Sequence, residues 1–261
     1  MQTETIRNNE NLQRYALALQ YNGKNYHGWQ VQQGALSVQG VLQESLSNVL
    51  RMPIHLFGCG RTDSGVHARY YVAHFDAKPM GKQEKEHLLW KMNVYLPFDI
   101  RLLGLKEVKQ SFNARFDALS RTYKYYISQT KQPFNNEFSF FCPFDLDIEK
   151  MNEASLKLCG CKDFTSFSKV HTQVNNFNCD VMFAHWEREN ELIVFTVKAN
   201  RFLRNMVRAL VGTLLMVGRR KITVDEFIGI VEAKDRKKAG VSVDAKGLFL
   251  EDIEYKDLSF R

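Results

Sequence analysis

Two kinds of apolar spacing alternate along this chain, and their order limits the folds it can adopt. Apolar residues at every second position from Tyr15 to Tyr21 indicate a strand, because successive side chains of a strand point to opposite faces. Apolar residues then recur every three or four positions from Val38 to Leu50, which indicates an amphipathic helix with Ser37 as its N-cap. A fold in which helices pack on a sheet is therefore expected.

The remainder of the first half continues this alternation. The expected elements are strands at 54–58, 70–75 and 100–108, a polar loop at 60–67 and a helix at 86–93. Together with the first strand and helix they give the order β-α-β-β-α-β. This order is typical of a compact α+β unit with its helices on one face of the sheet.

The second half repeats the order more loosely. Its expected elements are a strand at 122–128, a helix at 148–158 capped by Asp147, a hairpin of 180–186 and 191–198 around a turn at 188–190, helices at 201–217 and 224–233, and a strand at 248–255. Gly218 is expected to end the helix at 201–217. No long linker separates the halves, so we predict an α+β chain with a flexible tail (1–13) and two closely packed halves (14–108 and 109–261).

Charge and composition limit the kinds of molecule that this chain is expected to bind. The 36 lysines and arginines exceed the 29 acidic residues, for a net charge of +7, which favours a polyanionic partner. No apolar run is long enough for a membrane helix, and the polar start is unlike a signal peptide, so a cytoplasmic protein without a membrane partner is expected. The five cysteines are odd in number and lack zinc-site spacing, which predicts reduced thiols.

One short segment between two predicted strands concentrates groups that carry chemistry. Residues 58–68 contain three glycines. They also contain one acidic residue, Asp63, and two basic residues, Arg61 and His67. Asp63-Ser64-Gly65 has the composition of an ordinary β-turn with a solvated carboxylate. It is also compatible with a rigid loop that presents one carboxylate over a sheet, where functional groups often lie. A lone acid is a weak signal for hydrolysis by two carboxylates.

Arginines and aromatic residues suggest contacts with a nucleic acid. Arg201, Arg204 and Arg208 share one face of the helix predicted at 201–217, either as a solvated basic face or as guanidiniums aimed at phosphates or at a buried acid. Tyr123 lies in an aromatic strand that either packs in the core or stacks on bases. Further arginines in position to follow a phosphate backbone are Arg61, Arg115, Arg121, Arg219 and Arg220.

Metal and nucleotide chemistry find little support. His67 and His74 are seven positions apart, an odd spacing that strand alternation does not bring to one face, so we predict no metal site from them and Asp76. No phosphate-binding glycine loop or dinucleotide fingerprint is present. The residues alone therefore predict a basic α+β protein that binds RNA or DNA.

Several ordered motifs resemble one known family. The segment Gly60-Arg61-Thr62-Asp63-Ser64-Gly65-Val66-His67-Ala68 closely resembles the signature loop of the tRNA pseudouridine synthase A family, with Ser64 where relatives carry alanine. The resemblance extends from about residue 15 to 255, through motifs at 21–32, 38–43, 112–123, 163–167, 199–208 and 247–250. One departure is the segment 243–246, where relatives often have Ala-Pro before the Gly-Leu pair.

The resemblance implies both a fold and a function. It implies two ferredoxin-like halves that form a mostly antiparallel sheet around a central basic cleft. It also implies a homodimeric isomerase without cofactor or metal that converts uridine to pseudouridine at positions 38, 39 and 40 of the tRNA anticodon arm. Asp63 would be the catalytic aspartate, Tyr123 would contact the target base, and Arg208 would pair with Asp63.

The implied reaction removes the objection to a lone acid, because no water attacks and a second acid is unnecessary. A guanidinium beside Asp63 would keep the carboxylate ionised, and the target uridine would be flipped out of its stem. Whether the carboxylate acts as a nucleophile or as a base stays open. The alternative from another class is a non-catalytic ferredoxin-like RNA-binding module, which has no use for a buried acid that faces a polyanion.

Overall fold

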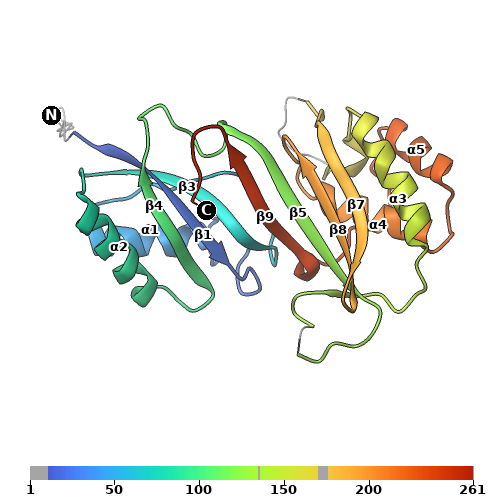
Figure 1. Cartoon of the computed structure of the whole chain (residues 1–261), viewed down its shortest axis with the longest axis horizontal. Coiled ribbons are helices and arrows are strands. Elements are labelled where there is room, and N and C mark those ends of the chain that lie inside the picture. The colour runs from blue at the N-terminus through green and yellow to red at the C-terminus, as the bar shows by residue number, and fades with distance from the viewer. Residues whose placement is uncertain (1–10, 135, 170–175, 261) are drawn as a thin grey trace.

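A computed structural model describes residues 11–134, 136–169 and 176–260, and one large sheet runs through them (Figure 1). In spatial order its main strands are β4 (Ile100–Glu107), β1 (Gln13–Tyr21), β3 (His67–Ala77), β9 (Leu248–Tyr255), β5 (Ala118–Ser128), β8 (Leu192–Ala199) and β7 (Val181–Glu189). Two short strands complete it, since β2 (Phe57–Gly58) pairs with β3 and β6 (Phe140–Phe141) pairs with β5. Only the β3–β9 and β5–β6 pairs are parallel, so the predicted mostly antiparallel α+β sheet is confirmed.

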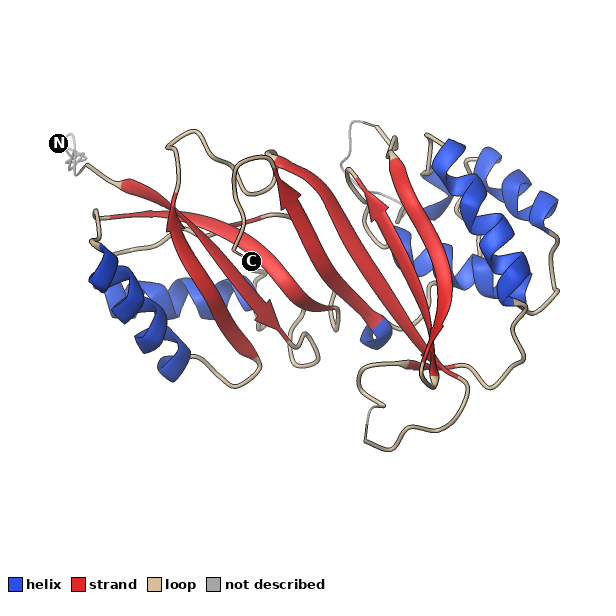
Figure 2. Ribbon diagram, in the orientation of Figure 1, coloured by secondary structure: helices blue, strands red, loops and turns tan. Residues whose placement is uncertain are grey.

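The helices form two groups, one at each end of the sheet (Figure 2). The first group is α1 (Val38–Leu50) and α2 (Lys82–Tyr95), and the second is α3 (Ile148–Lys157), α4 (Met206–Gly218) and α5 (Val224–Glu232). Each group packs against a face of its own half of the sheet. Between the two groups run strands β3, β9 and β5 of the sheet, which bring the two halves together.

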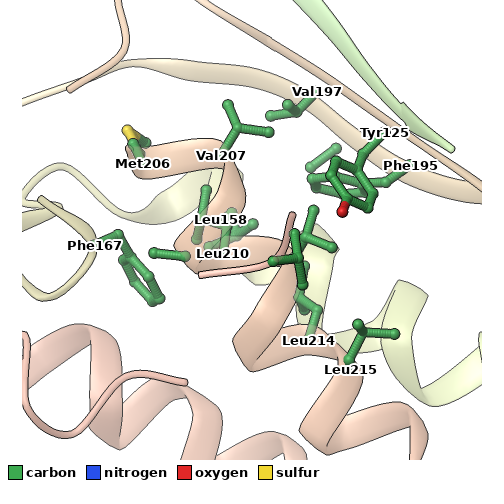
Figure 3. Packing of buried hydrophobic residues seen from close by; sticks show 14 of the residues in the cluster. Tyr125, Leu158, Phe167, Phe195, Val197, Met206, Val207, Leu210, Leu214 and Leu215 are labelled. Carbon is green, nitrogen blue, oxygen red and sulfur yellow. The ribbon is translucent and has the colours of Figure 1, made fainter. Parts of the chain in front are cut away.

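Each helix group encloses its own hydrophobic core. In the first half, Leu17 of β1 and Phe75 of β3 are fully buried in one cluster with Leu42 of α1. In the second, α4 places Leu210 and Leu214 in one cluster with strand residues such as Tyr125 and Phe195, as Figure 3 shows. Each fully buried side chain of this size contributes about 1.5–3 kcal/mol to the free energy of unfolding.

Strand β9 joins the two halves. It pairs with β5 along most of its length, but with β3 only where His67 is opposite Phe249 and Ala68 is opposite Leu250. These two residues begin β3, directly after the loop that contains Asp63. The loop therefore lies at the junction of the halves.

Most predicted elements are confirmed, including both predicted caps. The Ser37 side chain accepts a hydrogen bond from Gly40 N–H at the start of α1, and the Asp147 side chain accepts one from Lys150 N–H at the start of α3. Strand β9 has the predicted bounds. Helix α2 starts four residues earlier than predicted, because Glu84 accepts a hydrogen bond from Gly81 N–H and caps the first turn.

Two predicted elements are shorter in the structure. The strand predicted at 54–58 keeps only Phe57 and Gly58, because Ile54 N–H and Leu56 N–H donate to side chains of α1 instead of to a strand. The helix predicted at 201–217 begins only at Met206, because Asn205 has a left-handed backbone with a φ of 67°. Arg201 and Arg204 therefore precede the helix and do not share its face with Arg208.

The predicted tail at 1–13 falls mainly outside the described residues, which begin at 11, and β1 already starts at Gln13. Within the part of the chain that is described, no helix has the length and apolar character needed to cross a membrane.

Candidate active site

The aspartate loop, residues 59–66, connects β2 to β3 and is fixed by main-chain hydrogen bonds. Trp29 N–H donates to the Thr62 carbonyl (3.3 Å), and Gly65 N–H donates to the Tyr26 carbonyl (3.3 Å). The buried Tyr21 hydroxyl also lies 2.8 Å from the Thr62 hydroxyl. These contacts come from β1 and the turn that follows it, so the first half fixes most of the course of the loop, while Val66 at its end packs into the core of the second half.

A close approach of two backbones explains a glycine in the turn after β1. A Cβ atom at Gly28 would lie 2.3 Å from the Thr62 carbonyl oxygen, and Gly28 also has a φ of +88°. Only glycine tolerates both this contact and this backbone conformation. The motif His27-Gly28-Trp29, noted above only for its resemblance, thus supports the aspartate loop.

Asp63 lies between two guanidinium groups, one at each carboxylate oxygen. Arg208 Nη1 is 3.5 Å from Oδ2, and Arg204 Nε is 3.8 Å from Oδ1. The Asp63 side chain is 25% exposed, so the carboxylate remains accessible from solvent. The pairing with Arg208 is as the resemblance implied, whereas the proximity of Arg204 was not predicted from sequence, because the helix was expected to begin before it.

The backbone of the segment after α5 orients Arg208. Arg208 Nε donates to the Val243 carbonyl (2.7 Å), and Val243 N–H donates back to the Arg208 carbonyl (3.2 Å). Nη1 is thereby turned toward Asp63. Both contacts of Val243 use main-chain atoms, so the departure from the family pattern at 243–246 leaves them in place.

Tyr123 reaches the same region from β5. Its ring packs edge-on against Phe202, with the ring centroids 5.0 Å apart. Burial raises the pKa of the Tyr123 hydroxyl above its usual value, and the negative charge of Asp63 contributes to the same effect. The hydroxyl therefore stays protonated at neutral pH and is available as a hydrogen-bond donor.

Three further arginines named as RNA contacts lie in exposed or half-buried positions. Arg61 is exposed within the aspartate loop, and Arg115 is exposed with its guanidinium 5.4 Å from the ring centre of Phe116. Arg201 is half-buried and donates to the Asn176 side chain (3.3 Å). All three groups remain open to solvent in part.

Arg219 and Arg220 are not brought to Asp63. They follow the C-terminal end of α4, whose 13 residues span about 20 Å from the end that carries Arg208. The Arg219 guanidinium lies 3.5 Å from the ring centre of Phe144, and Arg220 pairs with Asp147 at 3.3 Å. Any contact of these two arginines with RNA is therefore separate from the site at Asp63.

The two histidines act as hydrogen-bond acceptors. Nδ1 of His67 accepts from Gly23 N–H, and Nδ1 of His74 accepts from Ala114 N–H, both at 3.1 Å. Burial lowers the pKa of both imidazoles, that of His74 to about 4 with a contribution from nearby Arg14. No group of three or more potential metal ligands occurs among the described residues.

Comparison with known proteins identifies the family. The profile described as "tRNA pseudouridine synthase" matches residues 154–256. The chain is 49% identical to the tRNA pseudouridine synthase A of Parabacteroides distasonis, over 95% of this chain and 98% of that protein. It is also 48% identical to the protein of the same name from Bacteroides fragilis, over 94% of this chain and 97% of that protein. The chain belongs to the tRNA pseudouridine synthase A family.

Proposed function

We propose that this chain converts uridine to pseudouridine at positions 38, 39 and 40 of the tRNA anticodon arm, with Asp63 as its catalytic residue. Membership of the family makes the chain an isomerase that acts on tRNA. The observation that carries the assignment of Asp63 is its position between the guanidiniums of Arg208 and Arg204, at the junction of the two halves. A non-catalytic RNA-binding module would gain nothing from a carboxylate in that position.

The reaction exchanges one bond for another within the same nucleotide. The N1–C1′ bond breaks, the uracil rotates, and C5 bonds to C1′, after which C5 loses its hydrogen and N1 carries one. A single ionised carboxylate serves this sequence, either by attack on C1′ or by removal of a ribose proton. Arg208 would hold the carboxylate of Asp63 in its orientation, and Tyr123 would contact the uracil and donate a hydrogen bond to it.

The target uridine must leave its stacked stem before it reaches Asp63, which costs a few kcal/mol. Contacts with phosphates would offset this cost, because each neutralised phosphate releases bound counterions. The arginines proposed for these contacts are Arg61, Arg115, Arg201, Arg204, Arg219 and Arg220.

We further propose that the two halves, 14–108 and 109–261, are each ferredoxin-like and enclose a basic cleft at the aspartate loop. Their strand orders support this, because each half places its fourth strand beside the first, the first beside the third, and the third beside the second. The orders are β4-β1-β3-β2 and β9-β5-β8-β7. A homodimer, a cytoplasmic location and the absence of a cofactor stay predictions from the resemblance.

The test is release of tritium from tRNA that carries 5-tritiated uridine, since C5 loses its hydrogen only when pseudouridine forms. Release is expected from tRNA with uridine at 38, 39 or 40, and none from tRNA with cytidine at all three positions. Release from the latter would contradict the proposed positions. Tight tRNA binding without any release would contradict the reaction and favour the binding module.

A further inference from the structure

Arg121, on β5 two residues before Tyr123, has an unusual hydrogen-bonding environment. Its Nη2 donates to the carbonyls of Cys59 (2.8 Å) and Arg115 (2.6 Å), and its Nη1 donates to the carbonyls of Asn200 (2.8 Å) and Ala118 (3.3 Å). The four terminal N–H groups of the guanidinium are thus all used by main-chain oxygens. Arg121 was expected above to follow a phosphate backbone, but these bonds leave it unsuited to that role.

The four carbonyls come from three segments that each lead to the site. Cys59 begins the aspartate loop, and Asn200 directly precedes the segment 201–205 that carries Arg204 and leads into α4. Arg115 and Ala118 lie in the stretch that enters β5. Among the described residues, three polar side-chain contacts join the aspartate loop to the second half of the chain. They are the bond from Arg121 to the Cys59 carbonyl and the two ion pairs of Asp63.

We propose that Arg121 is a positioning residue that holds the aspartate loop at its working distance from Arg208 and Tyr123. The proposal rests on the function proposed above. The first half fixes most of the course of the loop, but it does not fix where the loop lies relative to the guanidiniums of the second half. The β3–β9 pairing does so at the end of the loop, and the bond from Arg121 to Cys59 does so at its start, because the same guanidinium also binds the Asn200 carbonyl of the second half.

The chemistry of the side chain supports this role over that of a general stabiliser. A guanidinium is planar and holds its donors in a rigid fork, so it can bind carbonyls on two sides in a fixed geometry. A lysine carries three donors on a single nitrogen and cannot bridge the same separation. The positive charge of Arg121 also acts directly on the site, since it lowers the pKa of the Tyr123 hydroxyl against the larger upward effect of burial.

The proposal predicts a loss of rate with little loss of affinity. In Arg121→Lys and Arg121→Met, we expect the single-turnover rate of tritium release at saturating enzyme to fall about 10- to 100-fold, since small displacements of a reacting group have effects of this size. The dissociation constant for tRNA should change less than about threefold, because main-chain carbonyls already occupy the four terminal N–H groups of Arg121 that would bind a phosphate bidentately. Arg101→Met is the control for lost positive charge, since Arg101 is exposed, and it should match wild type in both measurements.

Circular dichroism and thermal unfolding identify any variant that fails to fold. If Arg121→Met does not fold, Arg121→Lys, which keeps the charge, decides the outcome. A folded Arg121→Lys with the wild-type rate would overturn the proposal, as would a variant with weakened binding and an unchanged rate. Absence of release from the wild-type protein would instead count against the proposed function.

Discussion

The two sides of the site are built in different ways. Asp63, from the first half, lies on a loop held by the main chain of Tyr26 and Trp29, in a packing that admits no side chain at Gly28. Arg204, from the second half, reaches Asp63 with a long side chain that is 58% exposed. The backbone therefore fixes the position of Asp63, whereas the exposed side chain of Arg204 can move. We expect substitutions that affect Asp63 and its loop to abolish the reaction, and substitutions of the arginines of the second half to reduce its rate or the affinity for tRNA.

The largest effect on the reaction rate should come from Asp63 itself, whose position the backbone fixes. Asp63→Asn keeps the shape of the side chain but removes the charge that the reaction needs, so tritium release should fall at least about 100-fold. The affinity for tRNA should stay the same or improve, because an anion is removed from a surface that meets phosphates. Release above about a hundredth of the wild-type rate would exclude Asp63 as the catalytic residue.

A pair of glycines tests whether the backbone fixes the loop. Gly28→Ala places a Cβ atom against the Thr62 carbonyl at a residue with positive φ, so we expect a loss of about 1–3 kcal/mol in the free energy of unfolding and a slower reaction. Gly60→Ala is the matched control within the loop itself, since a Cβ there meets no atom within 4 Å. Urea unfolding and tritium release should separate the two variants. Equal behaviour would mean that the close approach at Gly28 does not constrain the loop.

The pH dependence of stability gives a smaller effect in the first half. Because burial lowers the pKa of His74 to about 4, the unfolded chain binds a proton at a higher pH than the folded chain does. The contribution of His74 to stability is therefore complete above about pH 6.5 and is lost as the pH falls toward 4, by about 2 kcal/mol at pH 5. His74→Asn keeps an acceptor for Ala114 N–H without the titration, and its urea unfolding curves should depend less on pH over this range. An unchanged dependence would exclude His74 as its source.

The smallest effect should come from an exposed arginine of the second half, and it should be an effect on the affinity for tRNA. Binding of tRNA should weaken by orders of magnitude between about 50 and 200 mM salt if several phosphates are neutralised. Arg201→Met should reduce the slope of this dependence by about one, which is roughly a fourfold change in affinity across that range. Filter-binding titrations at several salt concentrations measure the slope. A slope identical to that of wild type would remove Arg201 from the phosphate contacts.

The sequence predicted best those features that depend on neighbouring residues. The caps at Ser37 and Asp147 are local hydrogen bonds, and the aspartate loop is a continuous motif, so both were found. The start of α4 was not, because the left-handed backbone of Asn205 accompanies a hydrogen bond from its side chain to Ser242, far along the chain.

The residues around Asp63 could likewise not be predicted from neighbouring positions in the sequence. The proximity of Arg204 depends on where α4 begins, and the role of Arg121 depends on carbonyls that lie up to 79 positions away in the sequence. Charge alone made all of these arginines candidates for phosphate contacts. Only the fold separates those that face Asp63 or bind carbonyls from those that remain open to solvent.

The central claim is that the first half fixes Asp63 and the second half places cations beside it. Its most direct test compares Arg208→Met with Arg204→Met. Single-turnover rates at saturating enzyme from pH 5 to 8 exclude effects on binding. Arg208→Met should be slower than wild type throughout this range, because the carboxylate loses the cation that lies 3.5 Å from it and orients it. Arg204→Met should lose less rate and mainly affinity, since Arg204 is farther from Asp63 and more exposed. An Arg208→Met variant with the wild-type rate at every pH, weakened only in affinity, would contradict the account.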